Sequence, residues 1–154
     1  MRSMTNSYIQ IWIHIVFSTK KRTPFLVHTP LRQMVFRYLA NTARRMGVKS
    51  VTVGGMEDHV HLLIALAKTI SIADFVKELK RNSSIWAKKQ DPSLEGFSWQ
   101  KGYGAFSVSH SGRHEVIRYI QNQEQHHRGL DFFDEYSRLF ALHEVDFDVR
   151  YLFD

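Results

Sequence analysis

The sequence predicts an α+β domain, in which an antiparallel sheet of four strands, in the element order βαββαβ, carries two helices on one of its faces. Apolar residues alternate with a period of two in four stretches and recur at helical spacing in two segments between them. The length agrees, because 154 residues without an internal repeat suit one domain and leave no room for a second. The predicted strands span residues 8–17, 48–53, 59–67 and 97–108, and the predicted helices span residues 29–47 and 71–90.

The first predicted strand, residues 8–17, has two distinct faces. One face is mixed polar and aromatic, with Gln10, Trp12 and His14, and the other is apolar. A basic turn follows the strand up to Pro24. A strand of this kind packs one face against a core and leaves the other available. The apolar face consists of Ile9, Ile11, Ile13, Ile15 and Phe17.

The first helix begins at Thr29 and Pro30, a pair typical of an N-cap and a first turn, and it ends near Gly47. Residues 48–53 form the second predicted strand, and the glycine-containing residues 54–58 form the reversal that leads into the third.

The second helix begins with Ser71 and Asp74, which resemble a capping box, and it continues to about Gln90. Its outer face is predicted either to be solvated or to follow a phosphate backbone. The fourth strand is predicted to bend at residues 102–104, where two glycines flank a tyrosine. The basic residues on the outer face of the second helix are Lys77, Lys80, Arg81 and Lys88.

Two more helices are predicted after the sheet, at about residues 113–127 and about 131–142. Residues 145–153 are expected to form a short final strand or to pack irregularly. The whole chain, residues 1–154, is therefore predicted to be one domain with a core at about 8–109, and the second face of its sheet is predicted to be open. The C-terminal helix and tail occupy residues 131–154.

Composition limits the function classes. Twenty-one lysines and arginines against fifteen aspartates and glutamates give a net charge of +6, which suits a polyanionic partner such as a nucleic acid without requiring one. The absence of cysteine excludes disulfides and thiolate-bound zinc. No apolar run approaches the ~20 residues of a membrane helix, and residues 1–7 lack the apolar region of a signal peptide, so a cytoplasmic location is expected.

The residues that suggest chemistry are His59 and His61, which would share one face of the third strand. Alternate strand residues lie about 6.5–7 Å apart, close enough for both imidazoles to bind one metal ion. Two histidines hydrogen-bonded on a half-exposed strand are the alternative, and a His-x-His pair alone does not decide between them.

A second candidate group lies in the helix at 113–127. Tyr119 and Gln123 are four residues apart, so they share one helical face and present a phenol beside a carboxamide. The alternative is a tyrosine half-buried beside the core and a solvated glutamine.

Together the two groups resemble a known family. His59-Val60-His61, preceded by Gly-Gly-Met-Glu-Asp and followed some sixty residues later by Tyr119-Ile-Gln-Asn-Gln123-Glu-Gln-His-His, is similar to the IS200/IS605 family of single-tyrosine HUH transposases, the Y1 transposases. The likeness extends over nearly the whole chain, including residues 97–106 and the closing Val-Arg-Tyr-Leu-Phe.

The resemblance implies a ferredoxin-like core and a metal-dependent transposase that nicks and rejoins single-stranded DNA, with hairpins, through a 5′-phosphotyrosine. It implies that His59, His61 and Gln123 bind Mg²⁺ or Mn²⁺ and that Tyr119 is the nucleophile. It also implies a homodimer in which the tyrosine helix of one subunit can complete the histidine site of the other. Ligand softness alone would favour manganese or zinc.

Two other functions are compatible with the residues. One is a non-catalytic ferredoxin-like nucleic-acid-binding module derived from such a transposase, and the other is a small metal-dependent hydrolase in which Tyr119 is structural. An adduct with DNA that depends on Tyr119 would separate the three.

Overall fold

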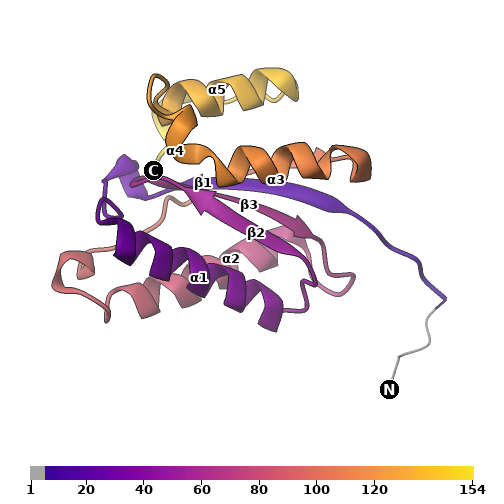
Figure 1. Cartoon of the computed structure of the whole chain (residues 1–154), viewed down its shortest axis with the longest axis horizontal. Helices are drawn as coiled ribbons and strands as arrows, with labels where there is room; N and C mark the ends of the chain where they lie inside the picture. The colour runs from indigo at the N-terminus through magenta and orange to yellow at the C-terminus, as the bar shows by residue number, and fades with distance from the viewer. Residues whose placement is uncertain (1–5) are drawn as a thin grey trace.

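The computed structural model describes residues 6–154, so residues 1–5 of the N-terminal stretch considered above lie outside it. One antiparallel sheet organises the fold, with the strands in the order β2-β3-β1-β4 (Figure 1). This is the order expected when two β-α-β halves interleave, and it confirms the predicted α+β class. The strands are β1 (Trp12–Ser18), β2 (Val51–Gly55), β3 (His59–Ala65) and β4 (Gly104–Val108).

Helices α1 (Thr29–Arg45) and α2 (Ile72–Ala87) cover one face of the sheet, as predicted (Figure 1). The Ser71 hydroxyl accepts a hydrogen bond from the Asp74 N–H and caps α2. In α1 the N-cap is His28, one residue earlier than predicted, and its side chain makes no cap hydrogen bond.

The main core lies between these helices and the sheet. In β1 and β3 alternate residues point into it, because neighbouring side chains of a strand lie on opposite faces. The register pairs Ile13 with Ile64 and Ile15 with Leu62, so the apolar faces of both strands coincide. Val60, Leu62 and Ile64 are fully buried, so the face of β3 opposite to His59 and His61 forms part of this core.

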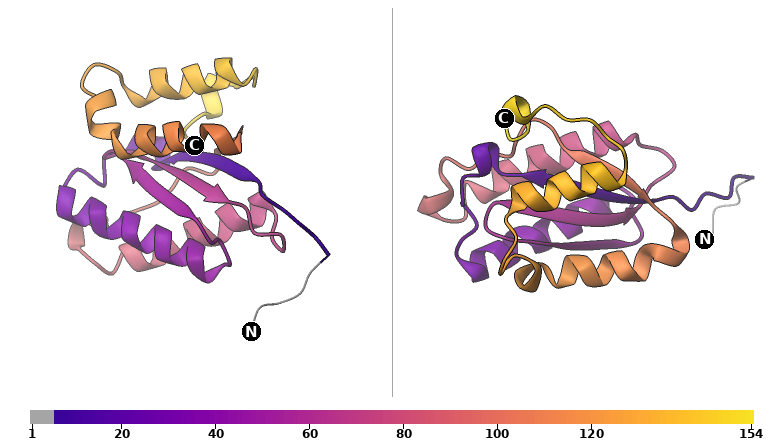
Figure 2. Two further views of the ribbon diagram at one scale, coloured as in Figure 1. Left: turned by 45° about the vertical axis from the view of Figure 1, so that its right-hand side comes forward. Right: turned by 90° about the horizontal axis from the view of Figure 1, so that it is seen from above.

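The second face of the sheet, predicted to be open, is covered. Helix α3 (Arg113–Gln121) lies over β2 and β3, and α5 (Phe132–Leu142) packs over β1 and β4 (Figures 1 and 2). The sequence analysis missed this because it predicted the helix at about residues 131–142 without assigning a surface for its apolar side to pack against. The smaller core on this face consists of Val16, Phe106, Phe132, Tyr136, Phe140 and Leu152.

Several predicted boundaries were wrong. Strand β1 begins at Trp12 rather than residue 8, and β2 runs through Gly54 and Gly55, which were assigned to the reversal. Strand β4 covers only residues 104–108, while Trp99 makes an isolated bridge to Thr19. The tail forms a short 3-10 helix at Val149–Tyr151 and no strand.

Lys80 does not lie on a solvated face of α2. Its ammonium group donates to the backbone oxygens of Gln100, Lys101 and Gly102 at 2.6–3.3 Å and lies 4.9 Å from the centre of the Phe17 ring. It therefore ties α2 to the loop that enters β4. Within residues 6–154, no helix is long and apolar enough to cross a bilayer.

Candidate active site

His59 and His61 lie on the second face of β3 and are completely buried. The alternation of β3 places both imidazoles on the side opposite the main core, as the sequence predicted. Asp58 orients the first ring, because its Oδ1 lies 2.7 Å from His59 Nδ1. The same carboxylate accepts from Arg22 at 3.3 Å, which links the basic turn after β1 to the histidine. This leaves the Nε2 atom of His59 facing the space beneath α5.

Glu135 of α5 occupies that space, and its side chain is 2% exposed. Its Oε1 lies 2.8 Å from His61 Nε2, 3.3 Å from His59 Nε2 and 3.1 Å from His127 Nε2. One carboxylate oxygen thus faces three imidazole nitrogens. Such an arrangement concentrates nitrogen and oxygen donors at one buried point.

The second oxygen of Glu135 faces the tyrosine helix. Oε2 accepts a hydrogen bond from the Tyr119 hydroxyl and another, of 3.0 Å, from Gln123 Nε2. The Tyr119 ring centre lies 5.6 Å from that of His61. Glu135 therefore joins the histidine pair to the phenol within a single chain.

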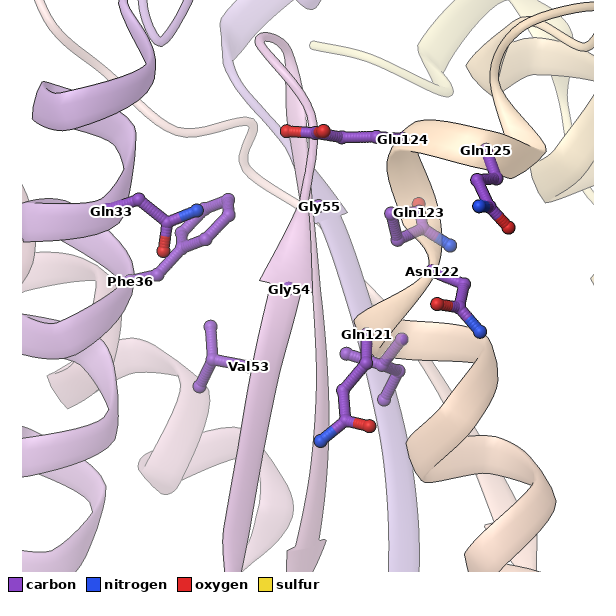
Figure 3. Close-up of a pocket in the computed structure, with 11 residues that line it drawn as sticks. Gln33, Phe36, Val53, Gly54, Gly55, Gln121, Asn122, Gln123, Glu124 and Gln125 are labelled. Atoms are coloured by element: carbon purple, nitrogen blue, oxygen red, sulfur yellow. The ribbon is translucent and has the colours of Figure 1, made fainter.

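Gln123 reaches the site because the predicted helix of residues 113–127 is broken. Helix α3 ends at Gln121, and Asn122 leaves helical geometry before α4 (Gln123–His126) begins. The turn directs the buried Gln123 carboxamide inward, where Oε1 lies 3.0 Å from His59 Nε2. Figure 3 shows Gln123 at this turn beside the Gly54–Gly55 end of β2.

Gly54 brings α3 close to the sheet. A Cβ atom at this position would lie 2.3 Å from the backbone oxygen of Ile120, the residue after Tyr119. Only glycine permits that approach without displacing α3. Gly54 therefore positions the tyrosine helix, although the sequence analysis assigned it to a turn.

The charges of the site follow from its contacts. Burial opposes ionisation of Glu135, but hydrogen bonds from His127, His59 and His61 outweigh it and hold the pKa of the carboxyl well below its ordinary value. Burial also opposes protonation of His59, yet hydrogen bonds with Asp58 and Glu135 raise its pKa to about 9. The site thus contains a carboxylate paired with an imidazolium when no metal is bound.

His61, His14 and Tyr119 stay neutral near pH 7. Burial lowers the pKa of His61 despite its bond to Glu135. Burial and the neighbouring His61 lower the pKa of His14 to about 3, and its Nε2 lies 2.9 Å from His61 Nδ1. Burial and the negative charge of Glu135 raise the pKa of Tyr119 above its usual value. The phenol therefore keeps its proton until an acceptor takes it.

The donor set fits a divalent cation. Ligand atoms of His59, His61 and Glu135 all lie within 4.8 Å of one another, and all three residues are buried. Ligands bonded at about 2 Å to one ion lie about 3 Å apart, which is the spacing found between Glu135 Oε1 and the two Nε2 atoms. The carboxamide oxygen of Gln123 is a fourth donor beside them.

The structure brings together all four residues singled out in the sequence: His59, His61, Tyr119 and Gln123. The sequence analysis missed Glu135, His127 and the supporting role of His14. A signal for Glu135 was present, because it lies three residues after Phe132 and four before Leu139, which places a carboxylate within the apolar stripe of α5. A charged residue in such a stripe needs a buried partner.

Comparisons with known proteins agree with this geometry. Residues 7–123 match the family model of IS200-like transposases. A relative, the ISDra2 transposase TnpA of Deinococcus radiodurans, is 30% identical over 119 residues, which cover 74% of this chain and 84% of the relative.

Two solved structures share the fold. A protein of Deinococcus radiodurans R1, described as a transposase, superposes with a TM-score of 0.61 at 28% identity, over 80% of this chain and 98% of that one. A REP-associated tyrosine transposase bound to a REP hairpin gives 0.56 at 16% identity, over 84% and 76% of the two chains.

The fold and the match over residues 7–123 define a protein of the transposase class. The chain belongs to the family of IS200-like transposases. The matched residues end at Gln123, so α5 and Glu135 lie beyond the part of the chain that the family model describes.

Proposed function

We propose that this protein nicks and rejoins single-stranded DNA, with Tyr119 as the nucleophile and a divalent metal ion held beside it. The observation that carries the proposal is the double role of Glu135, whose Oε1 faces His59 and His61 while Oε2 accepts from the Tyr119 hydroxyl. An ion site and a nucleophile are thereby separated by one carboxylate. Family membership supports DNA transposition as the purpose of the reaction.

The reaction is a transesterification. Tyr119 Oη attacks phosphorus in line with the leaving group, so the P–Oη bond forms and the P–O3′ bond breaks. The phenolic proton leaves along the hydrogen bond to Glu135 Oε2 and passes on to solvent, and the released 3′ oxygen takes a proton from solvent. Rejoining is the reverse: a 3′-hydroxyl attacks the 5′-phosphotyrosine and releases Tyr119. Bond energy is conserved, so no nucleoside triphosphate is needed.

The metal would be held by His59, His61 and oxygen atoms of Glu135 and Gln123. When bound, a divalent ion supplies electrophilic assistance by withdrawing charge from a non-bridging phosphate oxygen. Gln123 is the third ligand that the family resemblance implies, and Glu135 is a further ligand whose Oε1 lies near both Nε2 atoms. Mg²⁺ or Mn²⁺ is the proposed ion, since the carboxylate oxygen of Glu135 and the carboxamide oxygen of Gln123 suit these hard cations.

The proposed substrate is single-stranded DNA with hairpins at its ends. The net charge of +6 suits a polyphosphate, and one structural neighbour is a tyrosine transposase bound to a REP hairpin. The resemblance also implies a homodimer with composite sites. In this chain Tyr119 lies beside its own histidines, and the dimer with composite sites stays a prediction.

A covalent-adduct assay tests the proposal. The protein is incubated with Mg²⁺ or Mn²⁺ and labelled single-stranded DNA carrying hairpins, and the products are separated on a denaturing gel. We expect an adduct that disappears in Tyr119→Phe and in His61→Ala. Retarded but unmodified DNA would indicate a non-catalytic binding module, and cleavage that survives Tyr119→Phe would indicate a hydrolase.

A further inference from the structure

A cleft between α3 and α5 opens beside the Tyr119 hydroxyl. It has a volume of about 550 Å³, within the range of small-ligand sites, and Tyr119 and Glu135 form part of its wall. Its floor is the sheet, at His14 of β1 and Ser107 of β4. The cleft is therefore the space next to the reacting atoms that the proposed chemistry leaves unassigned.

The walls of the cleft differ in character. One part is apolar, formed by Val116 of α3 with Leu139 and Leu142 of α5. Leu142 is 75% exposed, so its surface faces the cleft and solvent rather than a core. An apolar patch beside a reactive group suits a flat, weakly polar ring such as a nucleobase.

The polar part of the wall contains Arg138. This side chain is exposed and takes part in none of the ion pairs found within residues 6–154, although Glu115 also lines the cleft. An unpaired guanidinium beside a nucleophile is suited to hold a phosphate through two parallel hydrogen bonds.

We propose that this cleft binds the nucleotide adjoining the scissile phosphate, with Arg138 on a backbone phosphate and Val116, Leu139 and Leu142 against the base. The inference rests on the proposed function for the position of the scissile phosphate. It extends that function to α5, which lies outside the residues that match the family model. The C-terminal helix thus contributes a substrate contact as well as Glu135.

The kinetic test uses Arg138→Ala and Arg138→Lys, with Arg118→Ala as the matched control. Arg118 is an exposed cation on α3 that does not line the cleft. We expect the single-turnover rate of adduct formation to fall at least about tenfold in Arg138→Ala, partly recover in Arg138→Lys, and stay within twofold in Arg118→Ala. In a Tyr119→Phe background, Arg138→Ala should reduce the log–log salt slope of DNA binding by about 0.7.

Photo-crosslinking separates failure of the cleft from failure of the chemistry. A short single-stranded oligothymidine containing 4-thiothymine is irradiated with the protein, and the modified peptides are mapped by mass spectrometry. Cross-links within 131–142 that weaken in Arg138→Ala support the cleft. They would do so even if no protein–DNA adduct forms, because a missing adduct contradicts only the proposed function. If adducts form equally well in wild type and Arg138→Ala, and cross-links map away from α3 and α5, the cleft proposal is wrong while the function stands.

Discussion

Replacing Glu135 by Gln removes one negative charge and preserves the shape of the side chain. In this structure the carboxylate meets His61 and His127 through Oε1, and Tyr119 and Gln123 through Oε2. A carboxamide cannot accept at both atoms, so at least one of these buried partners would be left facing an N–H₂ group. The change should therefore affect both the metal site and the phenol.

The expected loss of Mn²⁺ affinity in Glu135→Gln is at least about 100-fold, or about 2.7 kcal/mol. Isothermal titration calorimetry measures it directly. The matched control is Asp134→Asn, which makes the same charge change at an exposed position of the same helix and should leave the affinity within twofold. Wild-type affinity in Glu135→Gln, with affinity lost in His61→Ala, would refute the assignment of Glu135 as a ligand.

Four further predictions concern His59, Gly54 and Lys80. Because the pKa of His59 is raised to about 9 in the metal-free fold, and only the neutral imidazole binds metal, Mn²⁺ affinity should rise about tenfold per pH unit from pH 6.5 to 9; a flat calorimetric profile would contradict this. In the metal-free protein, the raised pKa of His59 stabilises the fold at pH values below the histidine pKa of the unfolded chain, about 6.5. That contribution is lost as the pH rises through 9, so the stability of the metal-free protein should fall over the same interval. Gly54→Val should push α3 away at Ile120 and slow adduct formation about 100-fold, whereas an unchanged rate would show that the close approach has no positioning role. Lys80→Met should leave backbone oxygens without a donor and lower the free energy of unfolding by about 2 kcal/mol in urea denaturation; no change would mean that solvent replaces the ammonium group.

Periodicity was sufficient for the first layer of the fold. The strands and helices that form the main core each bury one regular face. The spacing of the apolar residues alone therefore predicts that Ile13, Ile15 and Leu62 are buried. The second layer was not predictable in this way, because α5 packs across the sheet on residues far away in the sequence. Gly54 illustrates the limit, because its role depends on contact with Ile120, which comes more than sixty residues later in the chain.

The candidate site was predictable where the pattern is local. Two histidines separated by one strand residue, and a tyrosine and glutamine separated by one helical turn, define directions without any tertiary information. Glu135 required the tertiary arrangement, since only the packing of α5 against β1 and β4 brings it to the histidines. The sequence likewise placed His14 only on the mixed polar and aromatic face of the first strand, because its contact with His61 depends on the pairing of β1 with β3.

The central claim is that one divalent cation binds where His59, His61 and Glu135 converge, next to Tyr119. The most direct test is a crystal structure of the Mn²⁺-soaked protein with anomalous scattering measured for manganese. A single strong peak within bonding distance of both Nε2 atoms and Glu135 is the predicted result. A saturated crystal whose manganese peak lies away from the histidine pair, or that has none there, would contradict the claim.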